Sequence, residues 1–167
     1  MARTEENLKA AFAEESQANR RYTSFAERAD RDGLKQAARL FRAAAFAEEI
    51  HAKRHLVMLT GVKSTVENLQ AAIEGEGYES REMYPRFGRD ASAEGSKAAA
   101  LNFEQTGKVE KVHEELFKTS LRAVQEGRRL EDEPYYVCQT CGNTVEGEPP
   151  ERCPICGASK SVFKLVD

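Results

Sequence analysis

The stretch FAEEIHAKRH, residues 46–55, decides the fold. Glu48 and His51 lie three residues apart, so on a helix both side chains share one face. That face continues a stripe that should be apolar, made by Ala37, Phe41 and Ala44. A helix that turns a carboxylate and an imidazole toward its own core needs something to compensate them, because burying unpaired polar groups is costly.

The same pair recurs 62 residues later, as Glu110 and His113. A shift of 62 positions also brings equivalent aromatic and glycine residues into register, namely Tyr22 with Tyr84, Phe25 with Phe87, Gly33 with Gly95, and Phe41 with Phe103. The first two helices are therefore expected to be a copy of the next two.

Hydrophobic periodicity predicts four long helices, over residues 4 to about 31, 34–60, 66–92 and 96–126. Thr4 is the expected N-cap of the first helix, and Ser64 or Thr65 that of the third. Pro85 lies inside the third helix and is expected to kink it. Long helices with short connections predict an all-α, antiparallel four-helix bundle.

Acidic residues are expected on the inward faces of all four helices. Glu76 and Glu79 lie on one stripe of the third helix, and Glu15 lies on the stripe of the first. Buried carboxylates at this density are costly unless cations compensate them. One Glu from each of two helices, with Glu-x-x-His from each of the other two, is the pattern of di-iron and di-manganese bundles. The alternative, solvated charged faces, does not explain why the pattern repeats.

Spacing alone does not fix the roles of several other residues near the predicted site. The repeat aligns Glu76 with Glu14 rather than Glu15, so spacing leaves both open, although the apolar stripe favours Glu15. His55 follows His51 by four residues but has no histidine at its repeat position, so we expect it at the rim of the site. For the repeat-related tyrosines, Tyr22 and Tyr84, we expect hydrogen bonds to ligand carboxylates as well as core packing.

All four cysteines fall in the last 30 residues, as two C-x2-C pairs: Cys138, Cys141, Cys153 and Cys156. Without an export signal, this spacing predicts a tetrahedral metal site, for zinc or a single iron, rather than disulfides. A charged linker, residues 128–135, precedes them. We expect a bundle domain over 1–130 and a small metal-binding domain over 131–167.

The overall composition excludes some functions. Net charge is −3, which gives no indication of a nucleic-acid or membrane-surface partner. There is no apolar run of transmembrane length, and the N-terminus lacks the apolar core of a signal peptide. A cytoplasmic protein is expected.

Four segments closely resemble the rubrerythrin family: FAEESQANRRY, EEIHAKR, EGEGYESREMYPRF and the tail YVCQTCG…ERCPICG. The resemblance covers essentially the whole chain and implies a ferritin-like di-iron bundle followed by a rubredoxin-like domain. It implies that Glu15 is the ligand from the first helix and that Glu48 and Glu110 bridge the two irons. It also implies that Glu76 and His113 are terminal ligands of one iron.

For the other iron, the resemblance implies that Glu79 and His51 alternate as ligands, with Glu79 bound in the oxidised state and His51 in the reduced state. These two residues are therefore the expected catalytic pair. The four cysteines would hold one further iron. Two features depart from the family, a short connection between the second and third helices and Asn143, which stands where an aromatic or aliphatic residue is often found.

The activity that the resemblance implies is the two-electron reduction of hydrogen peroxide to water, as protection against oxidative stress. Electrons would come from rubredoxin or an NAD(P)H-dependent reductase and enter through the cysteine-bound iron of a homodimer. Two alternatives remain, a ferroxidase that uses O2 and a non-enzymatic metal-binding protein with zinc in its tail. The cysteine module favours electron delivery over the ferroxidase.

Overall fold

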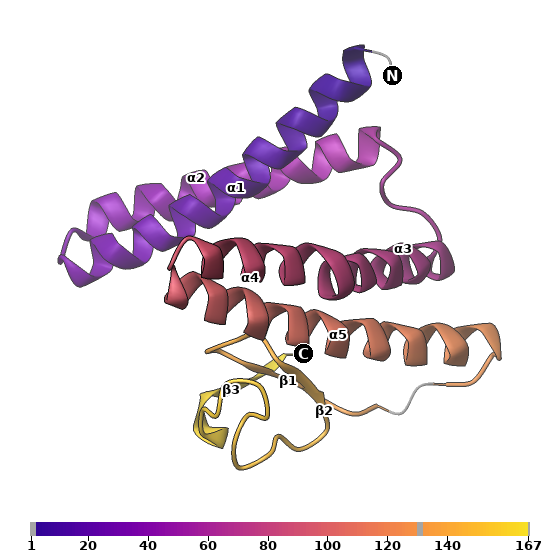
Figure 1. The fold of residues 1–167 in the computed structure, drawn as a ribbon. Helices are drawn as coiled ribbons and strands as arrows, with labels where there is room; N and C mark the ends of the chain where they lie inside the picture. The colour runs from indigo at the N-terminus through magenta and orange to yellow at the C-terminus, as the bar shows by residue number, and fades with distance from the viewer. Residues whose placement is uncertain (1–2, 130–131, 167) are drawn as a thin grey trace. The chain divides into compact units, whose positions relative to one another are not determined.

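In the computed structural model, helical segments are followed by a small three-stranded sheet (Figure 1). The structure describes residues 3–129 and 132–166. The helices are α1 (Arg3–Arg31), α2 (Lys35–Met58), α3 (Thr65–Tyr78), the π-helix η1 (Glu79–Met83), α4 (Tyr84–Ala93), α5 (Lys97–Gln125) and the 3₁₀-helix η2 (Lys160–Val162). The strands are β1 (Tyr135–Cys138), β2 (Thr144–Glu146) and β3 (Phe163–Val166). This mostly helical chain with a C-terminal strand domain confirms the predicted fold class. Within the described ranges, no helix is long and apolar enough to cross a membrane.

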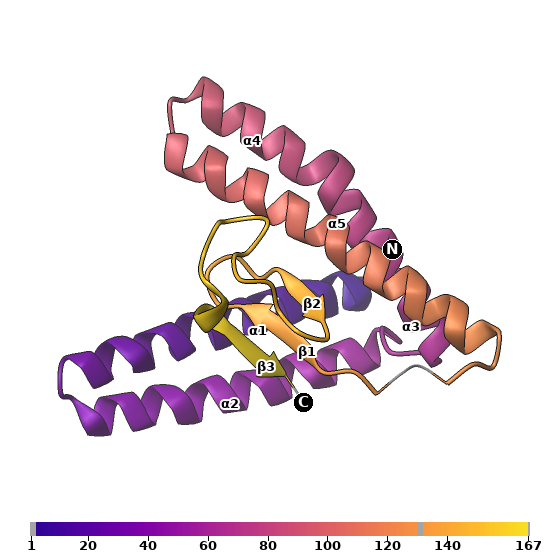
Figure 2. The ribbon, with the colours of Figure 1, turned by 90° about the horizontal axis from the view of Figure 1, so that it is seen from below.

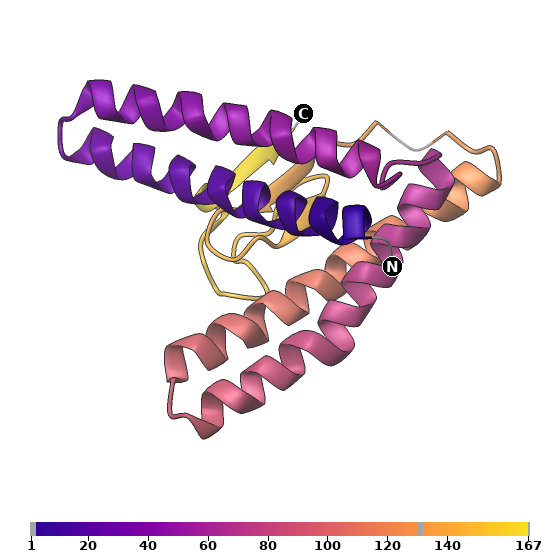
Figure 3. The same ribbon diagram turned by 90° about the horizontal axis from the view of Figure 1, so that it is seen from above.

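Two compact units make up the chain, and the first, Met1–Lys63, is the hairpin of α1 and α2 (Figure 3). Its helices pack through alanines, of which Ala38, Ala45 and Ala52 recur every seven residues along α2 and are all buried. Small side chains at this spacing let the two helices approach closely. The expected N-cap at Thr4 is wrong, because α1 already includes Arg3.

The second unit, Ser64–Asp167, contains α3, α4, α5 and the sheet (Figure 2). Of the two predicted caps of α3, Ser64 is the one that caps it, through a reciprocal capping box with Glu67, and Thr65 is the first helical residue. The third predicted helix is interrupted by the π-helix η1, in which the backbone N–H of Tyr84 donates to the carbonyl of Glu79. Pro85 follows in the first turn of α4, where its missing N–H is tolerated. Where a kink at Pro85 was expected, the structure has a π-helical turn just before the proline.

The internal repeat is visible in the packing of each unit. Tyr22, Phe25 and Phe41 form an aromatic trio with ring centroids 6.2, 6.3 and 5.5 Å apart. Tyr84, Phe87 and Phe103 form the equivalent trio at 6.2, 6.2 and 5.5 Å. The two helix turns match as well, since Gly33 and Gly95 adopt φ angles of +75° and +74°. These positions need glycine because such angles are strained for other residues.

The sheet has the antiparallel order β2-β1-β3 and lies against α5 (Figures 1 and 2). Burial raises the pKa of Tyr135 on β1, and the side chain of Ser120 on α5 lies close enough to the Tyr135 hydroxyl to oppose that shift. Gly142, in the turn before β2, lies close to Val109, so that a Cβ added to Gly142 would be 3.8 Å from Cγ1 of that valine. The small domain is thus held on the helix that carries Glu110 and His113.

Candidate metal centres

The first carboxylate–histidine cluster lies within the α1–α2 hairpin. Glu15 from α1 and Glu48 and His51 from α2 each place one ligand atom within 4.8 Å of the others. His51 Nδ1 lies 2.8 Å from Glu48 Oε2 and 4.0 Å from Glu15 Oε1. The hydrogen bond with His51 lowers the pKa of Glu48, even though desolvation opposes the shift. Glu14, in contrast, is exposed and pairs with Arg21 at 2.7 Å. The geometry therefore favours Glu15 over Glu14.

The second cluster repeats this geometry within the other unit. Glu76 from α3 joins Glu110 and His113 from α5, again with ligand atoms within 4.8 Å of one another. His113 Nδ1 lies 2.8 Å from Glu110 Oε2 and 3.9 Å from Glu76 Oε2. Burial, and then the hydrogen bond and negative charge of Glu110, raise the pKa of Glu76 to about 7. Two carboxyl groups this close cannot both ionise easily without a cation.

These donor sets fit a transition metal. Each cluster offers two carboxylates and an imidazole whose Nδ1 faces them, which is the mixed oxygen and nitrogen set that suits iron and similar ions. A divalent cation would also relieve the repulsion that raises the pKa of Glu76. The two clusters together contain six of the seven predicted bundle ligands.

The seventh, Glu79, lies outside both clusters at the first position of η1. Burial raises its pKa, and the negative charge of Glu76 raises it further, so the two carboxyl groups lie close enough to interact. π-Helical turns are frequent at functional sites because they change the direction of a side chain without ending the helix. Glu79 is therefore placed beside the second cluster but is not one of its three converging groups.

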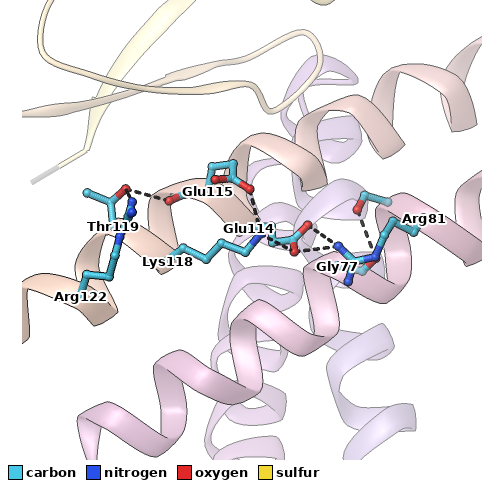
Figure 4. Close-up of polar contacts among 8 residues, drawn as sticks. Gly77, Arg81, Glu114, Glu115, Lys118, Thr119 and Arg122 are labelled. Atoms are coloured by element: carbon cyan, nitrogen blue, oxygen red, sulfur yellow. Dashed lines mark hydrogen bonds and ion pairs between the residues drawn. The ribbon is translucent and has the colours of Figure 1, made fainter. Parts of the chain in front are cut away.

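An ion pair between the exposed Arg81 and the buried Glu114 holds η1 against α5 (Figure 4). Arg81 of η1 donates from Nη1 to both oxygens of Glu114, at 2.7 and 2.8 Å. Lys118, one turn further along α5, adds a third contact at 2.8 Å. The Glu114 side chain is only 5% exposed. The pair thus fixes the position of the turn that carries Glu79 relative to the helix that carries His113.

The two tyrosines and His55 lie around the clusters. Burial raises the pKa of Tyr84, as do the charges of Glu79, Glu110 and Glu76. Both tyrosine rings belong to the aromatic trios, which confirms the packing part of their expected role. Their hydrogen bonds to ligand carboxylates stay a prediction. His55 lies outside both clusters, and its Nδ1 is buried without a hydrogen-bond partner among the described residues.

The four cysteines converge in the small domain as free thiols. Sγ of Cys138 lies 3.8 Å from that of Cys156, and Sγ of Cys141 lies 3.6 Å from that of Cys153. A tetrahedral metal with bonds of about 2.3 Å to sulfur requires sulfur separations of about 3.8 Å, so the site fits iron or zinc. Burial opposes ionisation of Cys138, but backbone N–H groups of Cys141 and Thr140 lower its pKa to about 7.

Sequence reasoning missed two sets of contacts near the clusters. One is the Arg81–Glu114 pair, since at the repeat position of Glu114 the first half has Ala52. The other is a hydrogen bond between His113 Nε2 and the Thr144 hydroxyl, 2.9 Å apart, which joins the cysteine domain to the second cluster. No periodic signal in the sequence marks either contact.

Comparison with known proteins agrees with both kinds of centre. A family model described as Rubrerythrin matches residues 6–121, and one described as Rubrerythrin, rubredoxin-like domain matches residues 136–164. A rubrerythrin of Nitratidesulfovibrio vulgaris is 37% identical over 99% of this chain and 95% of its own. A putative rubrerythrin of Methanocaldococcus jannaschii is also 37% identical, over 99% and 93%. The structure of partially reduced nigerythrin matches with a TM-score of 0.59 and 34% identity, covering 99% of this chain and 88% of that one.

Proposed function

Because this chain belongs to the rubrerythrin family, we propose that it reduces hydrogen peroxide to water with electrons that enter through its cysteine-bound iron. The family combines a di-iron site with a rubredoxin-like site of four cysteines. One observation carries the proposal: a single chain contains both carboxylate–histidine clusters and a complete tetrathiolate cluster. A ferroxidase needs the carboxylates and histidines but has no need of the four thiolates.

We propose that the two clusters together hold the two irons, with Glu79 as the additional ligand that joins or leaves as the oxidation state changes. His51 is the proposed ligand that exchanges with Glu79. When bound, the two ferrous ions supply the two electrons that O–O cleavage needs and act as Lewis acids toward the peroxide oxygens.

The protein's own side chains would orient the metals and supply protons. The histidines direct Nδ1 toward the carboxylates in both clusters. Without metal, burial raises the pKa values of Glu76 and Glu79, so metal binding would displace the proton from Glu76, and Glu79 would hold one only while it is not a ligand. Release of water from peroxide consumes protons, so Glu79, when it is not bound to metal, is suited to deliver one at its Oε atoms.

The proposed electron donor is rubredoxin or an NAD(P)H-dependent reductase, and the proposed assembly is a homodimer. The four thiolates support a one-electron entry site because iron held by four cysteines changes oxidation state with little change in its ligands. Zinc at this position would be redox-inactive and would remove the route.

A direct experiment compares the two oxidants. The iron-loaded protein is reduced without oxygen and mixed with hydrogen peroxide or with air-saturated buffer, while the visible colour of the ferric tetrathiolate is followed. We expect the colour to return much faster with peroxide. Faster return with oxygen would favour the ferroxidase alternative. Absence of the colour in protein purified with its native metals would exclude electron delivery through the cysteines.

A further inference from the structure

The two ring nitrogens of His113 contact different domains. Nδ1 faces the carboxylates of Glu110 and Glu76, at 2.8 and 3.9 Å. Nε2 lies 2.9 Å from Oγ1 of Thr144, the first residue of β2 in the cysteine domain. A candidate metal ligand and the rubredoxin-like domain of the same chain are thus in direct contact.

A second hydrogen bond extends this contact to the cysteine site. The Thr144 hydroxyl donates to the carbonyl of Gly142, at 3.3 Å. Its single proton is then used, so its oxygen is free to accept from His113 Nε2–H. Gly142 directly follows Cys141, and its own N–H donates to the carbonyl of Cys138 at 2.8 Å. Two hydrogen bonds therefore connect His113 to the turn that carries two of the four thiolates.

We infer that Thr144 is a positioning residue that orients His113 for metal binding and ties the cysteine domain to the second cluster. With Nε2–H donating to Thr144, Nδ1 would present its lone pair to a metal held between Glu76 and Glu110, in place of its metal-free hydrogen bond with Glu110. Outer partners of this kind fix the tautomer and ring orientation of metal-bound histidines. The inference rests on the proposed function only in assuming that the second cluster binds metal.

The packing around Thr144 supports a specific docking of the cysteine domain on α5. Val109, only 2% exposed, lies against Gly142, whose φ of +84° requires glycine at this turn. The Tyr135 hydroxyl also lies near the side chain of Ser120. Contacts at positions 109, 113 and 120 fall along one side of α5, with Thr144 at the middle one.

The first cluster has no such arrangement. Among the described residues, no hydrogen-bond partner is found for Nε2 of His51, whose side chain is 48% exposed, against 26% for His113. The repeat is therefore asymmetric at its two histidines. The rubredoxin-like domain contacts the histidine of its own unit, His113.

The test uses the full chain loaded with zinc, which is diamagnetic, and compares wild type with Thr144→Val and Thr144→Ser. Valine keeps the shape and suits a strand but removes the hydroxyl, whereas serine keeps it. Proton–nitrogen NMR of the histidine rings reports each Nε2–H. We expect a slowly exchanging His113 Nε2–H in wild type and Thr144→Ser, and its loss in Thr144→Val, while the His51 signals stay unchanged.

Metal affinity supplies a second readout. Competition with a chelator should show zinc binding at the second cluster weakened about tenfold or more in Thr144→Val, and within about twofold of wild type in Thr144→Ser. Cobalt absorption at the four cysteines reports whether the small domain folds in each variant. If the small domain of Thr144→Val does not fold, the test rests on the exchange rate of the His113 Nε2–H and the zinc affinity in wild type and Thr144→Ser.

The inference is overturned if the His113 Nε2–H of wild type exchanges as fast as that of His51. It is also overturned if folded Thr144→Val keeps both the protected proton and the affinity, or if folded Thr144→Ser loses them. None of these measurements uses peroxide. A protein that reacts faster with oxygen would therefore refute the proposed activity without affecting this result.

Discussion

Arg81 donates two hydrogen bonds from one guanidinium nitrogen to the buried carboxylate of Glu114, and this contact connects η1 to α5 one residue after His113. The pair has a close counterpart on the surface of the first unit, Arg21 with Glu14, at the same 2.7 Å. The two pairs differ chiefly in the burial of the carboxylate, because the Glu114 side chain is 5% exposed and that of Glu14 is 66% exposed, whereas both arginines are exposed.

Replacing Arg81 by methionine should destabilise the protein. Glu114 would keep only Lys118 as a charged partner, and a buried carboxylate that loses charged hydrogen bonds costs about 1–3 kcal/mol in the free energy of unfolding. Arg21→Met is the matched control and should cost about 0–1 kcal/mol, as exposed ion pairs do. Urea unfolding of the metal-free variants measures both. Equal losses would show that the burial of Glu114 has no energetic consequence.

The same pair should contribute to acid sensitivity. Hydrogen bonds from Arg81 and then Lys118 hold the pKa of Glu114 below its ordinary value of 4.5. A lowered pKa in the folded state means that the stabilisation is complete above pH 4.5 and is lost as the pH falls through the folded value. Glu114→Gln should therefore flatten the decrease in unfolding free energy on the acid side. An unchanged slope below pH 4.5 would contradict this.

Glu76 should have the opposite effect in the metal-free protein. Its folded-state pKa of about 7 lies above the ordinary 4.5, because of burial and the nearby Glu110. The folded state then binds the proton more tightly, so this contribution to stability is complete below pH 4.5 and is lost as the pH rises through about 7. Glu76→Gln should remove that dependence. Unfolding free energies of metal-free protein, measured from about pH 5 to about pH 8, test it.

Metal binding should compete with the same proton. Because the carboxylate form of Glu76 is the ligand, zinc binding at about pH 6 should release a proton, and the apparent affinity should rise with pH until about 7. Calorimetry in buffers of different ionisation enthalpy counts the released protons. Glu76→Gln should release fewer, whereas Glu74→Gln, an exposed control on the same helix, should match wild type. Equal release by the two variants would exclude Glu76 as the proton donor.

The features that could be predicted from the sequence are mostly those that the internal repeat carries in both halves. Glu48 and His51 could be paired with Glu110 and His113 because ligand spacing along a helix is a local property, and the two aromatic trios repeat for the same reason. The cysteine cluster was equally predictable, because each C-x2-C turn already places two thiolates side by side and a single contact between the two turns completes the site.

The missed features depend on contacts that differ between the halves or cross between domains. Nothing in the periodicity of residues 66–92 distinguishes a π-helical turn from a regular one, because η1 adds its extra residue without changing the local composition. Thr144 is thirty-one positions from His113, and only the docking of the sheet on α5 brings them together. Such contacts are set by tertiary packing rather than by local sequence.

Cys138→Ser tests the entry of electrons through the small domain. Serine removes one of four thiolates, so the variant should lose the ferric tetrathiolate colour and steady-state peroxide reduction with an external donor. The carboxylate–histidine clusters are untouched, so reduced protein should still consume one equivalent of peroxide in a single turnover. Gln139→Ala, at the exposed neighbouring position, is the control and should keep both activities. Steady-state turnover that survives in Cys138→Ser would mean that electrons reach the clusters by another route.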